Sequence, residues 1–439
     1  MRLSGNALVF LFSQEVILAT SMTKEELTVF DSMVEGFDAM LSYGAIARKL
    51  DPLTPEQMVH TRDRFWIDAP MIGSNYDGFD QTANFDGLTE TAVPATVGFH
   101  KADPRILSAK NLRNKTALTN WMDASKIKMA AAVNQALRTT VALQGSQFVK
   151  RTVAATGFDD LALAMAAMTE QGVPNADRAA MIGVRSGIGM AADLAKRAES
   201  TSRSSNAYST ALVAPGIANF ETYSDDAPIR LTPATGGATT VNGANQYFEP
   251  SAFYTQSDGE QVNLDNRRQN LTITAATYAN IKVGDAFTIA GVNSVHMIEK
   301  QDTGQLQTFR VVGKPSANVI QISPAIISNG GSTIGGREYQ NVTATPANGA
   351  AITWLNTATA ELNPFFVKSS LVLIPGTFEV EVGAGWLVAK ATTPKFGLPI
   401  TYTRQGDINT LNLKARLDID FGTVLINPQF AGAIAFNQV

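Results

Sequence analysis

The longest helical pattern in the chain constrains its fold more than any other feature. Across residues 111–149, apolar residues recur at helical spacing and polar residues fall between them. We expect the buried face to carry Leu118, Trp121, Met122, Met129, Val133, Leu137 and Val141, and we expect Lys126, Lys128, Asn134 and Arg138 to lie off it. About thirty residues at about 1.5 Å each make a rod of roughly 45 Å. Such a rod exceeds what a compact domain usually needs, and a chain of 439 residues is expected to form more than one domain.

A strand-rich segment, residues 223–358, interrupts two stretches of helical or mixed character. Short runs rich in Thr, Val and Ile alternate there with turn residues, at the spacing typical of a closed or nearly closed antiparallel barrel. The runs are TVNGANQYF, NLTITAA, DAFTIAGV, FRVVGK and NVIQISPAI. Before the segment, helices are expected from Phe158 to Gly172 and up to Ala198; after it, Phe365 resumes the host. The segment is therefore predicted to be an inserted β-barrel domain.

Two helix starts are expected near the N-terminus. Thr23 and Glu26 have the spacing of a capping box, and the helix after them is expected to run to about Lys49. Residues 54–57 repeat the signal with proline at the first helical position. The apolar run at residues 7–12 is shorter than the apolar core of a secretion signal. We therefore interpret the first residues as an apolar arm, with a helical hairpin that caps the chain's own core as the alternative for the whole N-terminal region.

A long hairpin is expected between Phe65 and Asp103. The turn signals YDG and FDG precede TAVPATVGF, which has the pattern of a strand with a bend at Pro94. Two strands alone expose too much backbone to be stable. This excursion is therefore expected to lie against another surface.

Composition excludes several classes of protein. The formal charge is −4, whereas a protein that reads nucleic-acid sequence normally carries a basic face. The chain has no cysteine, so disulfides, thiolate nucleophiles and Cys-ligated zinc are all excluded. No run approaches the roughly 18 apolar residues that a membrane span requires. Charged residues make up only 17% of the chain, which suits subunits that cover much of each other.

Two motifs imitate a short-chain dehydrogenase. G-x-x-x-G-I-G lies within residues 181–191, and Tyr278 with Lys282 gives Y-x-x-x-K. The first motif would have to follow a buried parallel strand and begin a helix, but the polar residues up to Arg178 leave at most residues 179–182 for that strand. The second pair would have to share one helix face, but its surroundings have the pattern of strand, turn, strand. We therefore expect no oxidoreductase.

No catalytic, cofactor-binding or metal-binding residue is predicted. The histidines His60, His100 and His296 lie far apart in the sequence. The acidic residues Asp77, Asp80, Asp86 and Glu90 lack the spacing of a calcium loop. The glycine-rich residues 329–336 lack the Lys-Ser/Thr of a phosphate loop.

Two runs, residues 262–292 and 397–422, resemble the coat proteins of short-tailed double-stranded-DNA bacteriophages. In that family a V-N-(L/V)-D-N-R run opens the barrel of an inserted domain, and a Q-G-D-(I)-x-T-L run lies on the return path into the shell-forming domain. Both runs stand here in that order, at Val262 and Gln405. The resemblance covers roughly residues 65–421. It implies an α+β fold, the Hong Kong 97 capsid fold with an inserted antiparallel barrel.

The resemblance also implies a division of the chain. Its parts would be an N-terminal arm (1–62), an E-loop (63–104), a P-domain with the spine helix (105–157), the first part of an A-domain (158–222), the inserted I-domain (223–358), the second part of the A-domain (359–400) and the P-domain return (401–439).

The function implied is that of a major capsid protein, which self-assembles as hexamers and pentamers into an icosahedral head around double-stranded DNA. The implied partners are further copies of the chain, a scaffolding protein and a portal, with a decoration protein left open and no cofactor. Assembly would take place in the host cytoplasm, and the product would be the virion. The alternatives are a secreted β-rich adhesin and, less well supported, the dehydrogenase.

One contact can be placed on named residues. Asp258 and Glu260 lie at an expected hairpin tip just before the V-N-L-D-N-R run. In the resembled family a loop here reaches the neighbouring subunit across a two-fold contact, where acidic side chains meet basic ones. The alternative is a solvated hairpin tip.

Overall fold

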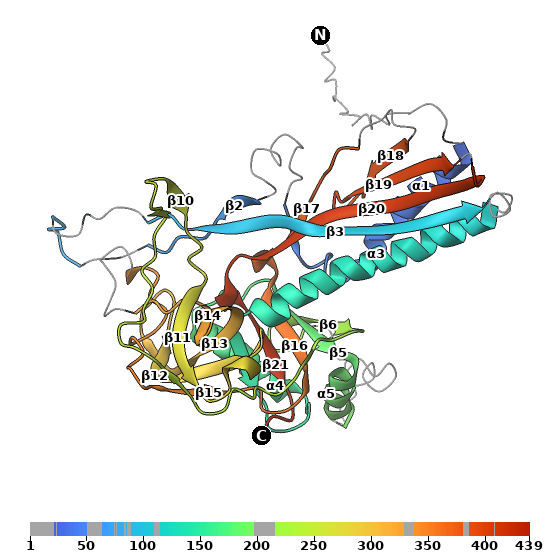
Figure 1. The fold of residues 1–439 in the computed structure, drawn as a ribbon. Coiled ribbons are helices and arrows are strands. Elements are labelled where there is room, and N and C mark those ends of the chain that lie inside the picture. Colours follow the sequence, from blue (N-terminus) through green and yellow to red (C-terminus); the bar gives the residue numbers. More distant parts are fainter. Residues whose placement is uncertain are drawn as a thin grey trace, which may run out of the picture.

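The computed structural model describes residues 22, 24–50, 64–73, 75, 77–82, 85, 89–108, 115–196, 216–328, 337–380, 386–407 and 409–439. A long twisted sheet and one long helix form an extended upper layer (Figure 1). A second sheet and a barrel lie below one end of that layer. The described part of the loop between β2 (Arg64–Asp68) and β3 (Ala92–Ser108) projects beyond the layer on the barrel side.

The long sheet is built around one very long strand pair. β3 (Ala92–Ser108) runs antiparallel to β20 (Asn412–Leu425), with pairing from Ser108↔Asn412 to Val97↔Gly422. Within the described residues the remaining members are β1 (Arg48–Lys49), β17 (Leu371–Pro375), β19 (Pro399–Asp407), β18 (Leu387–Thr392) and β2 (Arg64–Asp68). β2 pairs with the start of β3, which confirms the predicted two-stranded excursion.

The predicted rod is present as α3 (Lys115–Gln144), a helix of 30 residues. Its predicted apolar face is buried against the long sheet, with Met122, Val133 and Leu137 fully covered. The prediction that Asn134 and Arg138 lie off this face is wrong, because both side chains are buried. The helix ends just before Gly145, which lies so close to β21 that a Cβ there would be 2.8 Å from the carbonyl carbon of Ala431.

The N-terminal helix is shorter than predicted. α1 (Lys24–Phe37) is followed by a single 3-10 turn, η1 (Asp38–Met40), so the expectation of a helix to about Lys49 is wrong. The Asn134 side chain explains this end: its Oδ1 accepts from the Tyr43 amide at 3.2 Å, and its Nδ2 donates to the Met40 carbonyl at 3.0 Å. A tertiary contact thus takes the backbone groups that another helical turn would use. Thr23 and residues 54–57 lie outside the described residues.

A second sheet, the A-sheet, lies beneath the long sheet. Its strand order is β4 (Gln147–Lys150), β21 (Ala431–Ala435), β16 (Ala360–Val367), β5 (Arg178–Gly183) and β6 (Phe220–Asp225), with β7 (Arg230–Leu231) on β16. The helices α4 (Phe158–Glu170) and α5 (Val184–Lys196) belong to this part, and α4 matches its prediction. Strand pairing crosses two of the expected domain limits: β6 continues past residue 222, and β18 pairs with β19 across residue 400.

The inserted barrel is confirmed. Its strands close in the order β11 (Gln269–Ala275), β14 (Val319–Ser323), β13 (Asp302–Ser316), β12 (Ala286–Val295), β15 (Ala351–Trp354) and β8 (Thr239–Val241). The interior is apolar, with Phe287 stacked on Phe309 at 5.7 Å between ring centroids. The expectation that the V-N-L-D-N-R run opens the barrel is wrong, because β10 (Gln261–Asn263) pairs outside it, with β9 (Phe253–Thr255).

Candidate functional site

The hairpin of β9 and β10 carries the two residues predicted to contact a neighbour. The Gln256 amide donates to the Glu260 carbonyl at 2.8 Å, and the Glu260 amide donates to Asp258 Oδ1 at 3.0 Å. Gly259 supplies the left-handed residue of the turn, with φ of 88°. Both carboxylates are exposed, and neither forms an ion pair with another described residue. The predicted hairpin tip is therefore confirmed, and its contact with a neighbour stays a prediction.

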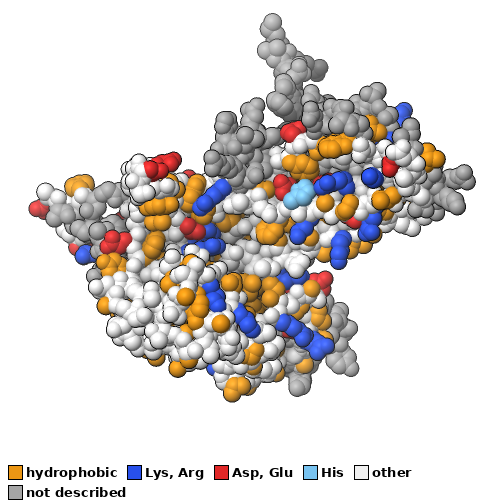
Figure 2. Space-filling model, viewed as in Figure 1, with side chains coloured by type: hydrophobic (Ala, Val, Ile, Leu, Met, Phe, Trp, Pro, Cys, Tyr) orange, Lys and Arg blue, Asp and Glu red, His pale blue; other side chains and the backbone are white. Residues whose placement is uncertain are grey.

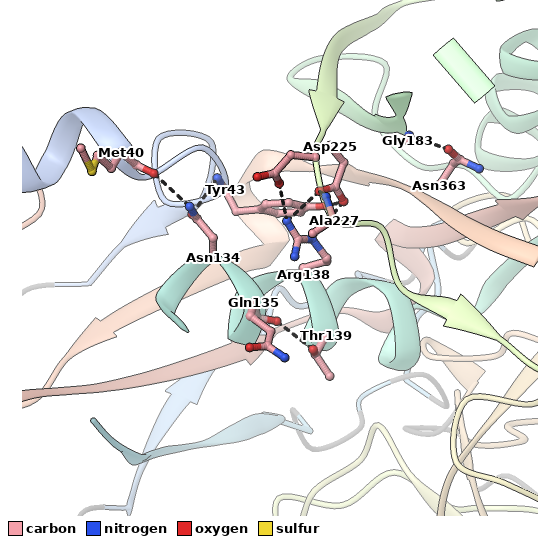
Figure 3. Close-up of polar contacts among 11 residues, drawn as sticks. Met40, Tyr43, Asn134, Gln135, Arg138, Thr139, Gly183, Asp225, Ala227 and Asn363 are labelled. Atoms are coloured by element: carbon pink, nitrogen blue, oxygen red, sulfur yellow. Dashed lines mark hydrogen bonds and ion pairs between the residues drawn. The ribbon is translucent and has the colours of Figure 1, made fainter. Parts of the chain in front are cut away.

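The dehydrogenase-like glycine motif lies in a setting that the sequence analysis did not expect. β5 is buried along its whole length, pairs in parallel with β6 and passes directly into α5, so the expectation that no such strand fits is wrong. Arg178 belongs to the strand because its buried guanidinium donates to the Val173 carbonyl at 2.6 Å. No residue separates Gly183 from the helix, and the Gly183 amide donates to Asn363 Oδ1 at 2.8 Å (Figure 3). A pyrophosphate loop needs free amides in that place.

The Y-x-x-x-K pair follows the predicted pattern of strand, turn, strand. Tyr278 lies in a 3-10 turn, η3 (Tyr278–Asn280), between β11 and β12. Its hydroxyl lies 2.6 Å from the Ser316 carbonyl, whereas Lys282 Nζ donates to Thr232 Oγ1 at 2.8 Å. The two side chains therefore serve separate structural contacts.

The described histidines occupy different regions. His100 on β3 lies with Nε2 3.2 Å from Asp418 on β20, whereas His296 accepts the Glu299 amide in a barrel turn. Among the described residues, no three His, Asp or Glu side chains come together as a metal site. Within the same part of the chain, no helix is long and apolar enough to span a membrane. His60, Asp86 and residues 329–336 lie outside it.

A buried polar junction joins the N-terminal segment, α3 and β6 (Figure 3). Arg138 Nη2 lies 2.6 Å from Asp225 Oδ1, and the side chains are 8% and 1% exposed. The Tyr43 hydroxyl donates to Asp225 Oδ2 at 2.7 Å, and its ring centroid lies 5.3 Å from the guanidinium carbon. Burial raises the pKa of Tyr43, and the charge of Asp225 raises it further. Burial by itself would lower the pKa of Arg138, but the interactions with Asp225 and Tyr43 together outweigh burial, so the pKa of Arg138 is raised. This junction holds three remote segments in one arrangement.

Sequence reasoning missed this junction. Asn134 and Arg138 stand one turn apart on α3, and both look like residues of a solvated face. Their partners lie far away along the chain: Tyr43 is 91 residues from Asn134, and Asp225 is 87 residues from Arg138. The available signal was that each follows a core residue directly, Val133 and Leu137, at the edge of the apolar face.

The C-terminal end of α3 is covered by the barrel. The fully buried Arg310 on β13 donates from Nη2 to the Ala142 carbonyl, and its guanidinium lies 5.1 Å from the centroid of Phe148. Thr308 on the same strand donates to the Ser146 carbonyl at 2.8 Å. Burial lowers the pKa of Arg310 to about 10. A cation at this end of a helix meets carbonyl groups that lack helical partners.

Exposed apolar side chains occur both on the barrel and on the long sheet. Figure 2 shows apolar side chains over the barrel and the long sheet, with many of the Lys and Arg side chains along the long sheet. Phe79, in the projecting loop, is completely exposed on a turn closed by hydrogen bonds from Gln81 to the Asp77 and Gly78 carbonyls. A groove of about 720 Å³ on the long sheet is lined by Ile106, Phe378 and Trp386 among others. Such surfaces are typical of subunits that are covered by further subunits.

The chain is similar to one protein family and to several solved structures. The family model of the P22 coat protein, gene protein 5, matches residues 18–436. Among solved structures, the CUS-3 coat protein I-domain is 41% identical over 28% of this chain and 98% of that one, with a TM-score of 0.22. Mycobacterium phage Che8 gives 8% identity over 90% of each chain at a TM-score of 0.44. The head structure of Helicobacter pylori bacteriophage KHP40 gives 12% identity over 100% of each chain at a TM-score of 0.37.

The family match covers nearly the whole chain, and the long sheet, α3, the A-sheet and the inserted barrel correspond to the parts expected of a Hong Kong 97 capsid fold. The chain belongs to the P22 coat protein family and is a major capsid protein of the phage head.

Proposed function

We propose that this coat protein assembles in the host cytoplasm, with a scaffolding protein and a portal, and that its hairpin tip joins neighbouring subunits. The acidic hairpin tip carries the second part of the proposal. Asp258 and Glu260 are exposed on a turn that is closed by its own hydrogen bonds, and the Asp258 carboxylate accepts one of them. A preorganised acidic tip suits a basic surface on another subunit.

We also propose a role for the projecting loop between β2 and β3. It would be the E-loop, an arm that extends toward an adjacent subunit, with α3 as the spine helix of the P-domain. The inserted I-domain would lie between β7 and β16, and the A-sheet would form the A-domain. The ordered turn that presents Phe79 supports the role of the arm, because an exposed aromatic side chain on a closed turn is suited to insert into a partner surface.

Co-expression tests the assembly proposal. The chain is expressed alone and with the scaffolding protein of the same phage, and the products are separated by sedimentation and imaged by electron microscopy. Closed shells of uniform size are expected with the scaffolding protein, and irregular or open particles without it. Uniform closed shells from the chain alone would show that no scaffolding protein is needed.

A further inference from the structure

The barrel contacts the rest of the molecule through two joints of different kinds. The first joint is apolar and lies against α3 and the A-sheet. Ala286 of the barrel belongs to a buried cluster with Ala142, Phe148, Leu231, Leu362, Ala433 and Ala435. Arg310 and Thr308 add hydrogen bonds to the end of α3. This joint fixes the barrel on the spine helix and the A-sheet.

The second joint lies at the neck of the projecting loop, which we define as residues 68–69 and 89–92, where β2 ends and β3 begins (Figure 1). The Tyr339 hydroxyl, from the barrel domain, donates to the Thr89 carbonyl at 2.8 Å. Asp265 forms a parallel backbone bridge with Ala92. The neck is therefore held from the barrel side at two points.

Asp265 belongs to the V-N-L-D-N-R run, whose residues 264–268 we call the strap. Its carboxylate accepts from Arg267 Nε at 2.8 Å and from Nη2 at 2.9 Å. The third nitrogen, Arg267 Nη1, donates to the Leu425 carbonyl at 2.6 Å, at the end of β20. The guanidinium thus links the neck contact of Asp265 to the long sheet. Arg268 adds a contact to Gln144 at the end of α3, at 3.3 Å.

The second joint lacks an apolar core. The buried cluster next to the neck contains Val93, Ala95, Val97, Val372, Ile374, Val424 and Ile426, all from the long sheet and its end. The buried cluster of the barrel contains barrel-domain residues alone. Between the two lies a cavity of about 130 Å³, with Ala69, Val93, Met297, Tyr339 and Phe430 in its wall. Joints made of a few hydrogen bonds around a cavity open at much lower cost than packed apolar joints.

We propose that the strap is a positioning device, in which Asp265 and Arg267 tie the neck of the E-loop to the barrel and so set the direction in which the E-loop projects. The barrel is fixed on α3 and the A-sheet, and the strap holds the neck in a fixed position relative to the barrel. The proposal rests on the proposed role of this loop as an arm toward a neighbouring subunit. The inserted domain then acts on assembly from within its own subunit, in addition to any contact made by its hairpin tip.

Site-directed spin labelling can test the strap directly. The chain has no cysteine, so labels attach only at cysteines that are introduced. Spin labels are placed at Met71→Cys, two residues beyond the neck and 52% exposed, and at Ala347→Cys on the exposed surface of the barrel domain. Pulsed electron paramagnetic resonance on the unassembled chain then gives the neck-to-barrel distance. A second labelled pair within the barrel domain, Val283→Cys with Ala347→Cys, reports whether that domain stays intact.

The starting chain is expected to give one narrow neck-to-barrel distance. Asp265→Asn should broaden the distance distribution. Arg267→Lys should also broaden it, because one amino group cannot hold both Asp265 and the Leu425 carbonyl as the guanidinium does. The effect of Arg267→Lys should be smaller, because a positive charge remains beside Asp265. Arg230→Lys is the matched control, because the pair of Arg230 with Glu361 is exposed on the arginine side and lies away from the neck, and it should leave the distance narrow. An unchanged distance in both strap variants would overturn the proposal, and so would equal broadening within the barrel domain. Failure to assemble would count against the proposed function without altering this measurement.

Discussion

At the scale of single residues, the buried pair of Arg138 and Asp225 shows how much can depend on one side chain. An ion pair in the interior is weak evidence of net stabilisation, because two charges lose their hydration. Here, however, the Tyr43 hydroxyl adds a further hydrogen bond to Asp225, and the pair joins three segments that are remote in sequence. Removing one partner would leave the other charge buried and uncompensated.

Arg138→Ala is therefore expected to lower the free energy of unfolding by about 3–5 kcal/mol. Urea denaturation of the unassembled chain, followed by circular dichroism, measures the loss. Arg230→Ala is the matched control, because its pair with Glu361 is exposed on the arginine side and should contribute only about 0–1 kcal/mol. Equal effects of the two substitutions would contradict the central place given to the junction.

Lys300 gives a prediction about pH. Its Nζ donates to the Glu338 carbonyl at 2.6 Å, and burial lowers its pKa to about 8 against the opposing charge of Glu338. Between that value and the ordinary lysine pKa, about 10.4, the unfolded chain holds a proton that the folded chain has lost. Stability contributed by this group therefore rises with pH across that interval.

Lys300→Met should abolish that rise. Urea midpoints measured at about pH 7.5 and about pH 9.5 give the change for each chain, and the starting protein should gain stability relative to the variant at the higher pH. Lys128→Met, on the exposed face of α3, is the control and should follow the starting protein. A parallel response of Lys300→Met and the starting protein would refute the role of Lys300.

At the scale of elements, the sequence predicted what local patterns determine. α3, α4 and the barrel strands follow from periodicity and turn residues, and the structure has them close to the expected positions. The errors occur where a side-chain contact decides, at long range for α1 and within five residues for β5. α1 stops early because Asn134 takes the backbone groups of Met40 and Tyr43. β5 includes Arg178 because the Val173 carbonyl satisfies its guanidinium.

Arg310 provides a test at this scale, since it joins β13 to the end of α3. Its side chain is fully buried, yet Nε and Nη1 make no hydrogen bond to the described residues. Arg310→Met keeps an unbranched side chain of similar length without the buried charge, so it should cost less than about 1.5 kcal/mol.

Arg310→Ala also leaves a cavity and should cost about 2–5 kcal/mol. Urea denaturation distinguishes the two variants, and Arg337→Met, an exposed arginine of the barrel domain, serves as the control. A larger loss in Arg310→Met than in Arg310→Ala would mean that the charge itself stabilises the end of α3.

At the scale of the whole molecule, the inserted barrel is expected to fold without its host. Its strands close on themselves around a core that includes Leu271, Phe287, Phe309 and Ile320. A fragment of residues 232–358 leaves out β6 and β7, which pair in the A-sheet. Its proton–nitrogen NMR spectrum should show dispersed amide signals, because a closed barrel carries its own core. A random-coil spectrum would show that the barrel needs α3 and the A-sheet.

The hairpin tip and the long-range polar contacts were only partly predictable. The hairpin tip at Asp258 depends on local turn residues, so the sequence revealed it before the structure did. The junction of Arg138 with Asp225 and the strap contact of Arg267 with Leu425 join residues 87 and 158 apart, and no local pattern identifies the remote partner. The V-N-L-D-N-R run was recognised by resemblance, but its position outside the barrel strands became clear only from the pairing of β10.

The acidic tip gives the test for the assembled shell. Asp258→Asn with Glu260→Gln removes both charges and keeps an acceptor for the Glu260 amide, so the hairpin stays closed. The free energy of unfolding of the unassembled variant should lie within about 0.5 kcal/mol of that of the starting protein, because substitutions of exposed residues change stability little. Each contact contributes only about 0–1 kcal/mol, but a shell repeats it at every equivalent interface, so sucrose gradients and micrographs should show unstable or misassembled particles. Glu249→Gln with Glu299→Gln removes two other exposed carboxylates of the barrel domain and should assemble normally. Normal particles from the tip variant would place Asp258 and Glu260 among ordinary solvated turns.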